Sequence, residues 1–307
     1  MEEYVKKYMG DKGHSSSHTE NTLLRNLKRI EKVFSTPFEK WKVSDYSNPE
    51  KVLEELSDLY KLNTVIVTIS ALKMWLTSKD APAKLLDKYE TELSKLIKEK
   101  EEIVYEQKKT PTEEKLGDYF RWPKLEQATK EYLRENSKDA RGESLRDLTA
   151  LALFTLQPPA RLGNYLDMEI VNDGEDDGKD NYLVLEDGAP DRFVFNKYKT
   201  AKYLGRTEMK IHSNLLADIL TDYLEQLAEK ESPDGILFPG WKSTDLSNAL
   251  KRTTKKYLPV GITLNPLRHS YLSHFLSQNP SINDKKKIAN LMGQTYDVPR
   301  AEKYARL

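Results

Sequence analysis

Four residues in the second half of the chain have the types and neighbours that metal-free cleavage of a phosphodiester requires. Arg161 follows an apolar run and a proline pair, Lys199 follows a short β-branched run, and Arg268 stands near the start of a helix-forming segment. Tyr304 stands ten residues after Gln294. Arginine suits a phosphate clamp because its planar fork meets two oxygens at once and stays charged. A lysine can protonate the leaving hydroxyl and a tyrosine can attack phosphorus, so the set covers each step of such a reaction.

Each of these residues also has an ordinary structural interpretation when it is taken alone. An arginine after a proline pair usually caps a turn or lies on the surface, and Lys199 fits an ordinary hairpin lysine. Arg268 and His269 fit a helix start, and Tyr304 fits a packed terminal aromatic. Tyr296 is a weaker second candidate for the nucleophile. The chemical interpretation therefore depends on the ordered set rather than on any one member.

The charge of the chain is balanced overall but unevenly distributed. It holds 49 basic and 49 acidic residues, which counts against DNA binding because neutralisation of phosphates drives affinity. Residues 167–191 hold ten acidic residues and one lysine, whereas residues 192–210 hold six basic residues and one acid. Further basic clusters lie at residues 251–256 and 285–287. The pattern permits one basic face, and ordinary solvated surface is the alternative for each cluster.

The composition argues against several kinds of site. The chain has no cysteine, which rules out disulfides, thiolate zinc sites and thiol nucleophiles. Its five histidines show no metal-ligand spacing with carboxylates, so we expect neither a metal nor a cofactor. No run approaches the length of about eighteen apolar residues that a membrane span needs, and the N-terminus has no apolar secretion core. We therefore expect an intracellular protein with no membrane partner.

Residues 1–110 are expected to form a helical bundle. Apolar residues at helical spacing follow Thr19, and residues 83–107 have the pattern of a long charged helix. Residues 63–77 favour a helix, although their Val-Ile-Val-Thr-Ile run also fits a strand. Residues 1–18 are polar and rich in glycine and serine, and they are expected to form either a mobile arm or a helix followed by a loop.

A second domain is expected over residues 111–307, after a polar linker at residues 108–112. Helical patterns cover residues 121–135, 143–157, 213–229, 243–257, 266–278 and 282–292. Between them, after Ile170, three short alternating or β-branched runs are separated by Asp/Gly turns. Such runs predict a small antiparallel sheet. The expected fold class is therefore mostly α with a small antiparallel β-sheet.

Four segments, taken in order, resemble the catalytic domain of the tyrosine recombinase (phage-integrase-like) family of DNA breaking and rejoining enzymes. They are Gln157-Pro158-Pro159-Ala160-Arg161, Tyr198-Lys199-Thr200, Leu264-Asn265-Pro266-Leu267-Arg268-His269, and Leu291-Met292-Gly293-Gln294 followed by Tyr304. The resemblance spans roughly residues 110–307. The helical N-terminal part resembles that family's core-binding domain, which implies that residues 1–110 bind DNA and residues 111–307 hold the catalytic site.

The resemblance also implies a role for each main site residue. Tyr304 would attack the scissile phosphate and form a 3′-phosphotyrosyl link. Arg161 and Arg268 would clamp the non-bridging oxygens and stabilise the charge of the transition state. Lys199 is favoured over Lys197 because a threonine follows it, and it would donate a proton to the leaving 5′-oxygen.

Two positions depart from the family's pattern. Asn265 stands where the family usually has histidine, and Gln294 stands where it has histidine or tryptophan. Both amides can form hydrogen bonds but cannot carry a proton charge. They would bond the phosphate or position Tyr304, while His269 would support the site. Many family members continue after the tyrosine with a helix that docks on a neighbouring subunit; we expect that contact to be absent here or made by another segment.

The function that the resemblance implies is site-specific recombination or integration of double-stranded DNA, as in mobile genetic elements and viruses. It implies four protomers on two duplexes, and neither metal nor nucleotide, because the phosphotyrosyl bond conserves the energy for rejoining. A type IB topoisomerase is one alternative, since it uses similar chemistry on one duplex as a monomer. A degenerate recombinase that acts as a DNA-binding module is the other, and it would bind without forming an adduct.

Overall fold

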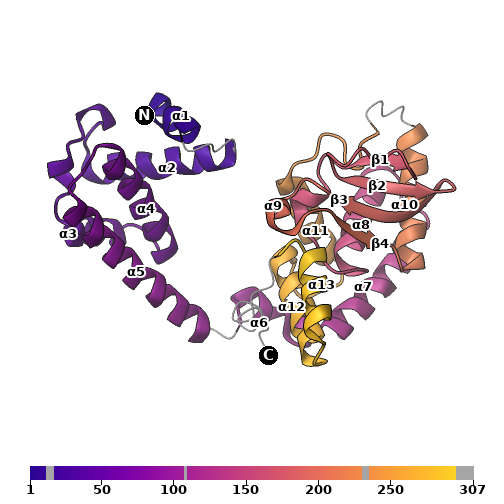
Figure 1. Ribbon diagram of the computed structural model, residues 1–307. Coiled ribbons are helices and arrows are strands. Elements are labelled where there is room, and N and C mark those ends of the chain that lie inside the picture. Colours follow the sequence, from indigo (N-terminus) through magenta and orange to yellow (C-terminus); the bar gives the residue numbers. More distant parts are fainter. Residues whose placement is uncertain (12–16, 107–108, 230–234, 295–307) are drawn as a thin grey trace. The chain divides into compact units, whose positions relative to one another are not determined.

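The computed structural model describes residues 1–11, 17–106, 109–229 and 235–294 (Figure 1). The chain divides into two compact units, Met1–Gln107 and Lys108–Leu307, and each is described by itself. This division falls three residues before the boundary expected at residues 110 and 111. No helix within the described ranges combines the length and apolar character that crossing a membrane would need.

The N-terminal unit is made of helices, with two short 3₁₀ turns between the second and third. The helices are α1 (Glu2–Asp11), α2 (Ser17–Phe34), α3 (Pro49–Ser57), α4 (Leu62–Ser78) and α5 (Ala83–Glu106). The start of α3 follows from its sequence, because Pro49 occupies the first turn and the Asn48 side chain accepts a hydrogen bond from the Lys51 amide. Residues 2–11 are a helix and not a mobile arm, since Val5 and Met9 of α1 are buried in the core of this unit.

The segment that fitted either a helix or a strand is the helix α4 at the centre of the N-terminal unit. It contacts α2, α3 and α5, so that Val65, Ile69 and Leu72 are buried with almost no exposed surface. Its Trp75 packs edge-on against Trp41 and Tyr46, whose ring centroids lie 5.3 and 5.7 Å away. Burial on several sides explains the β-branched run, because packing overrides the weak strand preference of valine and isoleucine.

The second unit begins with a helix where a linker was expected. Helix α6 (Pro111–Leu116) starts inside the predicted linker, because Thr110 and Glu113 form a reciprocal capping box. The remaining helices are α7 (Trp122–Asn136), α8 (Gly142–Thr155), the short α9 (Ala201–Leu204), α10 (Asn214–Glu229), α11 (Ser243–Thr254), α12 (Leu264–Ser277) and α13 (Ile282–Leu291). The almost fully buried α8 lies at the centre and contacts α7, α10, α11 and α12.

The sheet of this unit is mixed and has four strands, in the order β1 (Glu169–Asn172), β2 (Tyr182–Glu186), β3 (Ala189–Phe195) and β4 (Thr207–Lys210). The β2–β3 and β3–β4 pairs are antiparallel, as predicted. The prediction of a purely antiparallel three-stranded sheet is wrong at its edge, where β1 pairs with β2 in parallel. β1 has only four residues and no alternating burial pattern, so its sequence does not distinguish it from a loop.

Tyr165 joins the sheet to the helical core. Its ring is fully buried and packs edge-on against Phe154 of α8 and against Phe193 of β3, with centroids 5.2 and 5.4 Å away. Burial raises the pKa of its hydroxyl above the ordinary value. Tyr165 therefore anchors the turn that follows Arg161 against both α8 and the sheet.

Candidate active site

The centre of the candidate site is the turn that ends α13. Gly293 has a left-handed backbone with φ of +67°. Its amide donates to the Asn290 carbonyl at 2.8 Å, and the Gln294 amide donates to the Ala289 carbonyl at 2.8 Å. This pair of bonds is the Schellman arrangement, which glycine favours because it has no Cβ. The arrangement turns the chain sharply, and the carbonyl groups of Met292 and Gly293 become acceptors for side chains from elsewhere in the unit.

Arg161 and Thr200 both donate to the carbonyl oxygen of Gly293. The Arg161 Nε lies 2.9 Å from that oxygen and the Thr200 Oγ1 lies 3.0 Å from it. Arg161 precedes a 3₁₀ turn, Leu162–Asn164, with an extended backbone. These bonds bring Arg161 and the residue after Lys199 to the same carbonyl oxygen.

Arg268, in α12, also bonds to the turn that ends α13. Its side chain is 4% exposed, and Nη1 donates to the carbonyl of Pro159 at 2.7 Å and to that of Met292 at 3.0 Å. One guanidinium therefore holds the proline pair before Arg161 and the end of α13 together. The two predicted arginines converge with the segment of Lys199 on residues 292 and 293.

The structure separates the two lysines considered for proton transfer. Lys197 Nζ lies 2.9 Å from a carboxylate oxygen of Asp180, and this hydrogen bond raises the pKa of the ammonium above its ordinary value. Lys199 is exposed, and no carboxylate of the described residues forms an ion pair with it. A lysine with a raised pKa releases its proton less readily, so the geometry favours Lys199 as the donor.

The acidic segment at residues 167–191, which contains β1, β2 and the start of β3, neutralises most of the cations in the basic segment that follows it. Arg192 bonds to Asp173 and to Asp191, at 2.5 and 3.0 Å. Further pairs are Arg192 with Glu208, Lys197 with Asp180, Arg206 with Asp176 and Glu208, and Lys210 with Asp191. The positive charge of the expected basic face is therefore largely neutralised by ion pairs along the strands. Within the described part of the chain, the cations of this run without a carboxylate partner are Lys199 and Lys202.

The other predicted site residues are placed less centrally. Asn265 is exposed in the first turn of α12, and Gln294 is half-buried directly after Gly293. His269 points toward α6, where its Nδ1 lies 2.6 Å from Oε1 of the fully buried Glu113. Tyr304 and the weaker candidate Tyr296 lie outside the described residues.

Sequence reasoning missed several residues that build this site. Gly293 was noted only as part of a motif, although a glycine directly after a helical pattern is a known sign of a left-handed cap. The bond of Thr200 to Gly293 was not foreseen. Glu113 could have been found from Thr-Pro-Thr-Glu, which is the signature of a capping box.

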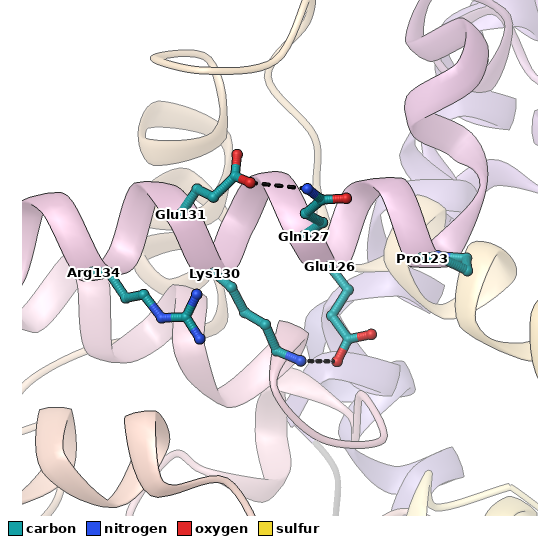
Figure 2. A pocket seen from close by; sticks show the side chains of 6 residues that line it. All are labelled: Pro123, Glu126, Gln127, Lys130, Glu131 and Arg134. Atoms are coloured by element: carbon teal, nitrogen blue, oxygen red, sulfur yellow. Dashed lines mark hydrogen bonds and ion pairs between the residues drawn. The ribbon is translucent and has the colours of Figure 1, made fainter.

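A hollow on the outer face of α7 is a separate feature (Figure 2). Its lining comes from one helix, and two pairs of its side chains bond to each other. Lys130 pairs with Glu126 at 2.7 Å, and Gln127 donates to Glu131 at 3.0 Å. The hollow shares no residue with the site around Gly293. Among the described residues, no group of three histidine or carboxylate side chains is placed to hold a metal ion.

Comparison with known proteins shows which solved structures have a similar fold. A scan against models of protein families finds no match, and neither does a search of curated proteins. Among solved structures, the chain is similar to the Tn1549 transposon integrase in complex with transposon right end DNA. The identity is 14%, the TM-score is 0.56, and the match covers 99% of this chain and 93% of that one. It is also matched to the crystal structure of XerA recombinase at 13% identity and a TM-score of 0.41, over 100% of this chain and 92% of that one.

The likeness to the integrase extends over both units of the chain and includes the helical core with its small sheet. The prediction of a mostly α fold with a small sheet is confirmed, with β1 as the added strand. The chain therefore has a tyrosine recombinase-like fold, as the order of its motifs predicted.

Proposed function

We propose that the chain is a site-specific DNA recombinase that cuts and rejoins duplex DNA through a covalent phosphotyrosyl intermediate. The observation that carries this proposal is the convergence of Arg161, Arg268 and the turn bearing Lys199 on the carbonyls of Met292 and Gly293. Segments as far apart as residues 161 and 293 meet there, and they carry the cations that the proposed phosphoryl transfer without metal would use. The likeness of the fold to an integrase supports the same conclusion.

In the proposed reaction, the Tyr304 hydroxyl releases its proton to solvent as its oxygen attacks phosphorus, a tyrosyl O–P bond forms, and the bond from phosphorus to the 5′-oxygen breaks. Lys199 gives its proton to that leaving oxygen. Arg161 and Arg268 hold the two non-bridging oxygens, where negative charge develops. A 5′-hydroxyl then attacks the phosphorus of the phosphotyrosyl link and displaces the Tyr304 oxygen, which regains its proton. Rejoining therefore needs no nucleotide. Asn265 and Gln294 flank these groups and act as hydrogen-bond donors to the phosphate or to Tyr304.

The proposed partner is double-stranded DNA, bound by four protomers that hold two duplexes. Support comes from the integrase of similar fold, which is described in complex with the end of a transposon. Residues 1–110 would grip the duplex from the side opposite the catalytic unit. We propose that the protein acts inside the cell, where the target DNA of a mobile genetic element lies.

Trapping of the covalent intermediate tests this function. A duplex with a nick next to the cleavage site releases a short fragment on cutting, so rejoining is blocked and the adduct accumulates on a denaturing gel. We expect an adduct with the wild-type chain, none with Tyr304→Phe, and an unchanged adduct with the control Tyr296→Phe. DNA affinity should stay the same in all three, because only one hydroxyl is lost.

Other outcomes would identify the alternatives. An adduct that persists in Tyr304→Phe and disappears in Tyr296→Phe would move the nucleophile. DNA binding without an adduct by the wild-type chain would indicate a DNA-binding module. Relaxation of a plasmid that lacks any target site would indicate a topoisomerase.

A further inference from the structure

We propose that Asn181 is a positioning residue that holds the turn of Lys199 in register with Arg161. The inference deepens the proposed function and rests on it. Asn181 directly precedes β2 and lies far from the phosphate clamp along the sequence, and nothing in its neighbourhood of the sequence marks it as a site residue.

The side-chain amide of Asn181 is 4% exposed and uses all of its hydrogen-bonding capacity. Its Nδ2 donates to the carbonyl of Asn164 at 3.0 Å and to that of Lys197 at 2.9 Å. Its Oδ1 accepts from the amides of Asn196 and Lys197, at 2.9 and 2.8 Å. Two donors and two acceptors on one short side chain are available only in asparagine among the residues of this length.

These four bonds connect the two segments on which the proposed chemistry depends. Asn164 ends the turn that begins at Arg161, and Lys197 lies two residues before Lys199. At the far end of the lysine turn, Thr200 meets Arg161 at the Gly293 carbonyl. The lysine turn is thus tied at both ends to the segment of Arg161, through Asn181 at one end and Gly293 at the other.

The sheet alone does not fix this turn. β3 ends at Phe195 and β4 begins at Thr207, so the residues between them lie outside the ladder of strand hydrogen bonds. The Asn196 side chain also donates to the carbonyl of Asp180 at 2.8 Å, which ties the turn to the sheet but not to Arg161. Loss of the Asn181 amide would therefore leave Lys199 attached to the sheet and, through Thr200, to the Gly293 carbonyl, but would remove the tie between residue 197 and the turn of Arg161.

A shift of this kind has a specific chemical consequence. Displacement of a catalytic group by about 1 Å can lower a rate by about 10²-fold. The buried Asn181 does not reach solvent or substrate, so DNA affinity should be unchanged while proton donation becomes slower. A substrate whose leaving group needs no proton should remove the defect, because the position of Lys199 no longer matters for it.

The experiment measures single-turnover cleavage by full-length Asn181→Asp and the milder Asn181→Ser on two substrates. One is an ordinary phosphodiester and the other has sulfur at the 5′-bridging position, which leaves without protonation. We expect a loss of about 10- to 100-fold on the first substrate and recovery to within a few-fold of wild type on the second. Leu183→Ala is the control, because it removes core volume in β2 without touching the turn and should lower both rates alike.

Equal losses on both substrates for Asn181→Ser, or no loss on either, would overturn the inference while the proposed function stands. If Asn181→Asp does not fold, Asn181→Ser keeps the same comparison, since it removes the amide without adding a buried charge. A wild-type chain that cleaves neither substrate would overturn the proposed function, and the inference with it.

Discussion

Four arginines of the second unit form two groups that differ in what they bond. Arg161 and Arg268 donate to main-chain carbonyls at the turn of Gly293, whereas Arg192 and Arg206 at the sheet bond to carboxylates. A carbonyl oxygen carries no net charge, so bonding to it orients a guanidinium without cancelling its charge. A carboxylate orients it and neutralises it as well. Arg161 is therefore suited to bind an anion, and the second group is suited to hold the sheet together.

The same difference explains how a chain of zero net charge can present a cationic site. The acidic residues within and between the first three strands pair with the cations of the strands and of the loop before β4, while the turn of Gly293 supplies neutral partners. Local pairing, and not the sum of charges, decides which cations remain available to DNA.

The largest expected effect concerns the carbonyl-bound arginines. Arg161→Ala and Arg268→Ala should each slow cleavage by about 10²- to 10³-fold, the scale for loss of one preorganised transition-state donor. Replacement by lysine should rescue poorly, because a point charge cannot reproduce a bidentate fork. Arg192→Ala and Arg206→Ala should stay within a few-fold of wild type. Single-turnover adduct formation checks all four, and a near-wild-type rate for Arg161→Ala would remove that residue from the site.

The second prediction compares the two lysines of the turn. Lys199→Ala should lower the cleavage rate by about 10²-fold, within the range for loss of a general acid. Lys197→Ala should have little effect, because its ammonium is held by Asp180. A 5′-bridging sulfur substrate should restore Lys199→Ala and not Arg161→Ala. Rescue of Lys197→Ala instead would place the proton donor two residues earlier.

The third prediction concerns the turn that gathers the site. Gly293→Ala puts a Cβ on a left-handed residue, which costs about 1–2 kcal/mol of stability, and sets it 3.7 Å from Arg161 Cδ. Gly188→Ala in the β2–β3 turn is the matched control, since it also has a positive φ and meets nothing within 4 Å. Urea unfolding should show similar losses of stability, whereas cleavage should fall several-fold further in Gly293→Ala. Equal cleavage by the two variants would mean that the turn does not position Arg161.

The smallest effect is expected in DNA binding by the unpaired cation of α9. Lys202→Gln should make the dependence of log K on log salt shallower by about 0.9, the contribution of one phosphate contact. Lys210→Gln should leave the slope unchanged, because that ammonium lies 3.4 Å from Asp191. Binding isotherms at several salt concentrations provide the slopes. A change for Lys210 equal to that for Lys202 would show that ion pairing within the sheet does not withhold cations from DNA.

The sequence was informative where local chemistry sets the structure. Periodicity located the long helices, and the motifs around Arg161 and Arg268 pointed to segments that do meet. The sequence was uninformative where contacts between residues far apart in the chain determine the structure. β1 forms because β2 lies beside it, and Asn181 gains its role only because residues 164 and 197 flank it. The pairing of the strand cations likewise depends on the folding back of the acidic segment, which no spacing reveals.

The response of Arg268→Ala to the charge of the scissile phosphate tests most directly whether the carbonyl-bound arginines act on that phosphate. Arg268 is buried and holds two carbonyls, so loss of activity alone would not separate a phosphate contact from a structural role. A methylphosphonate replaces one non-bridging oxygen by methyl and removes the charge that the arginine would stabilise. We predict that Arg268→Ala loses about 10²-fold or more against wild type on phosphate and less than about tenfold on methylphosphonate. The same loss on both substrates would contradict the claim that the carbonyl-bound arginines act on the phosphate.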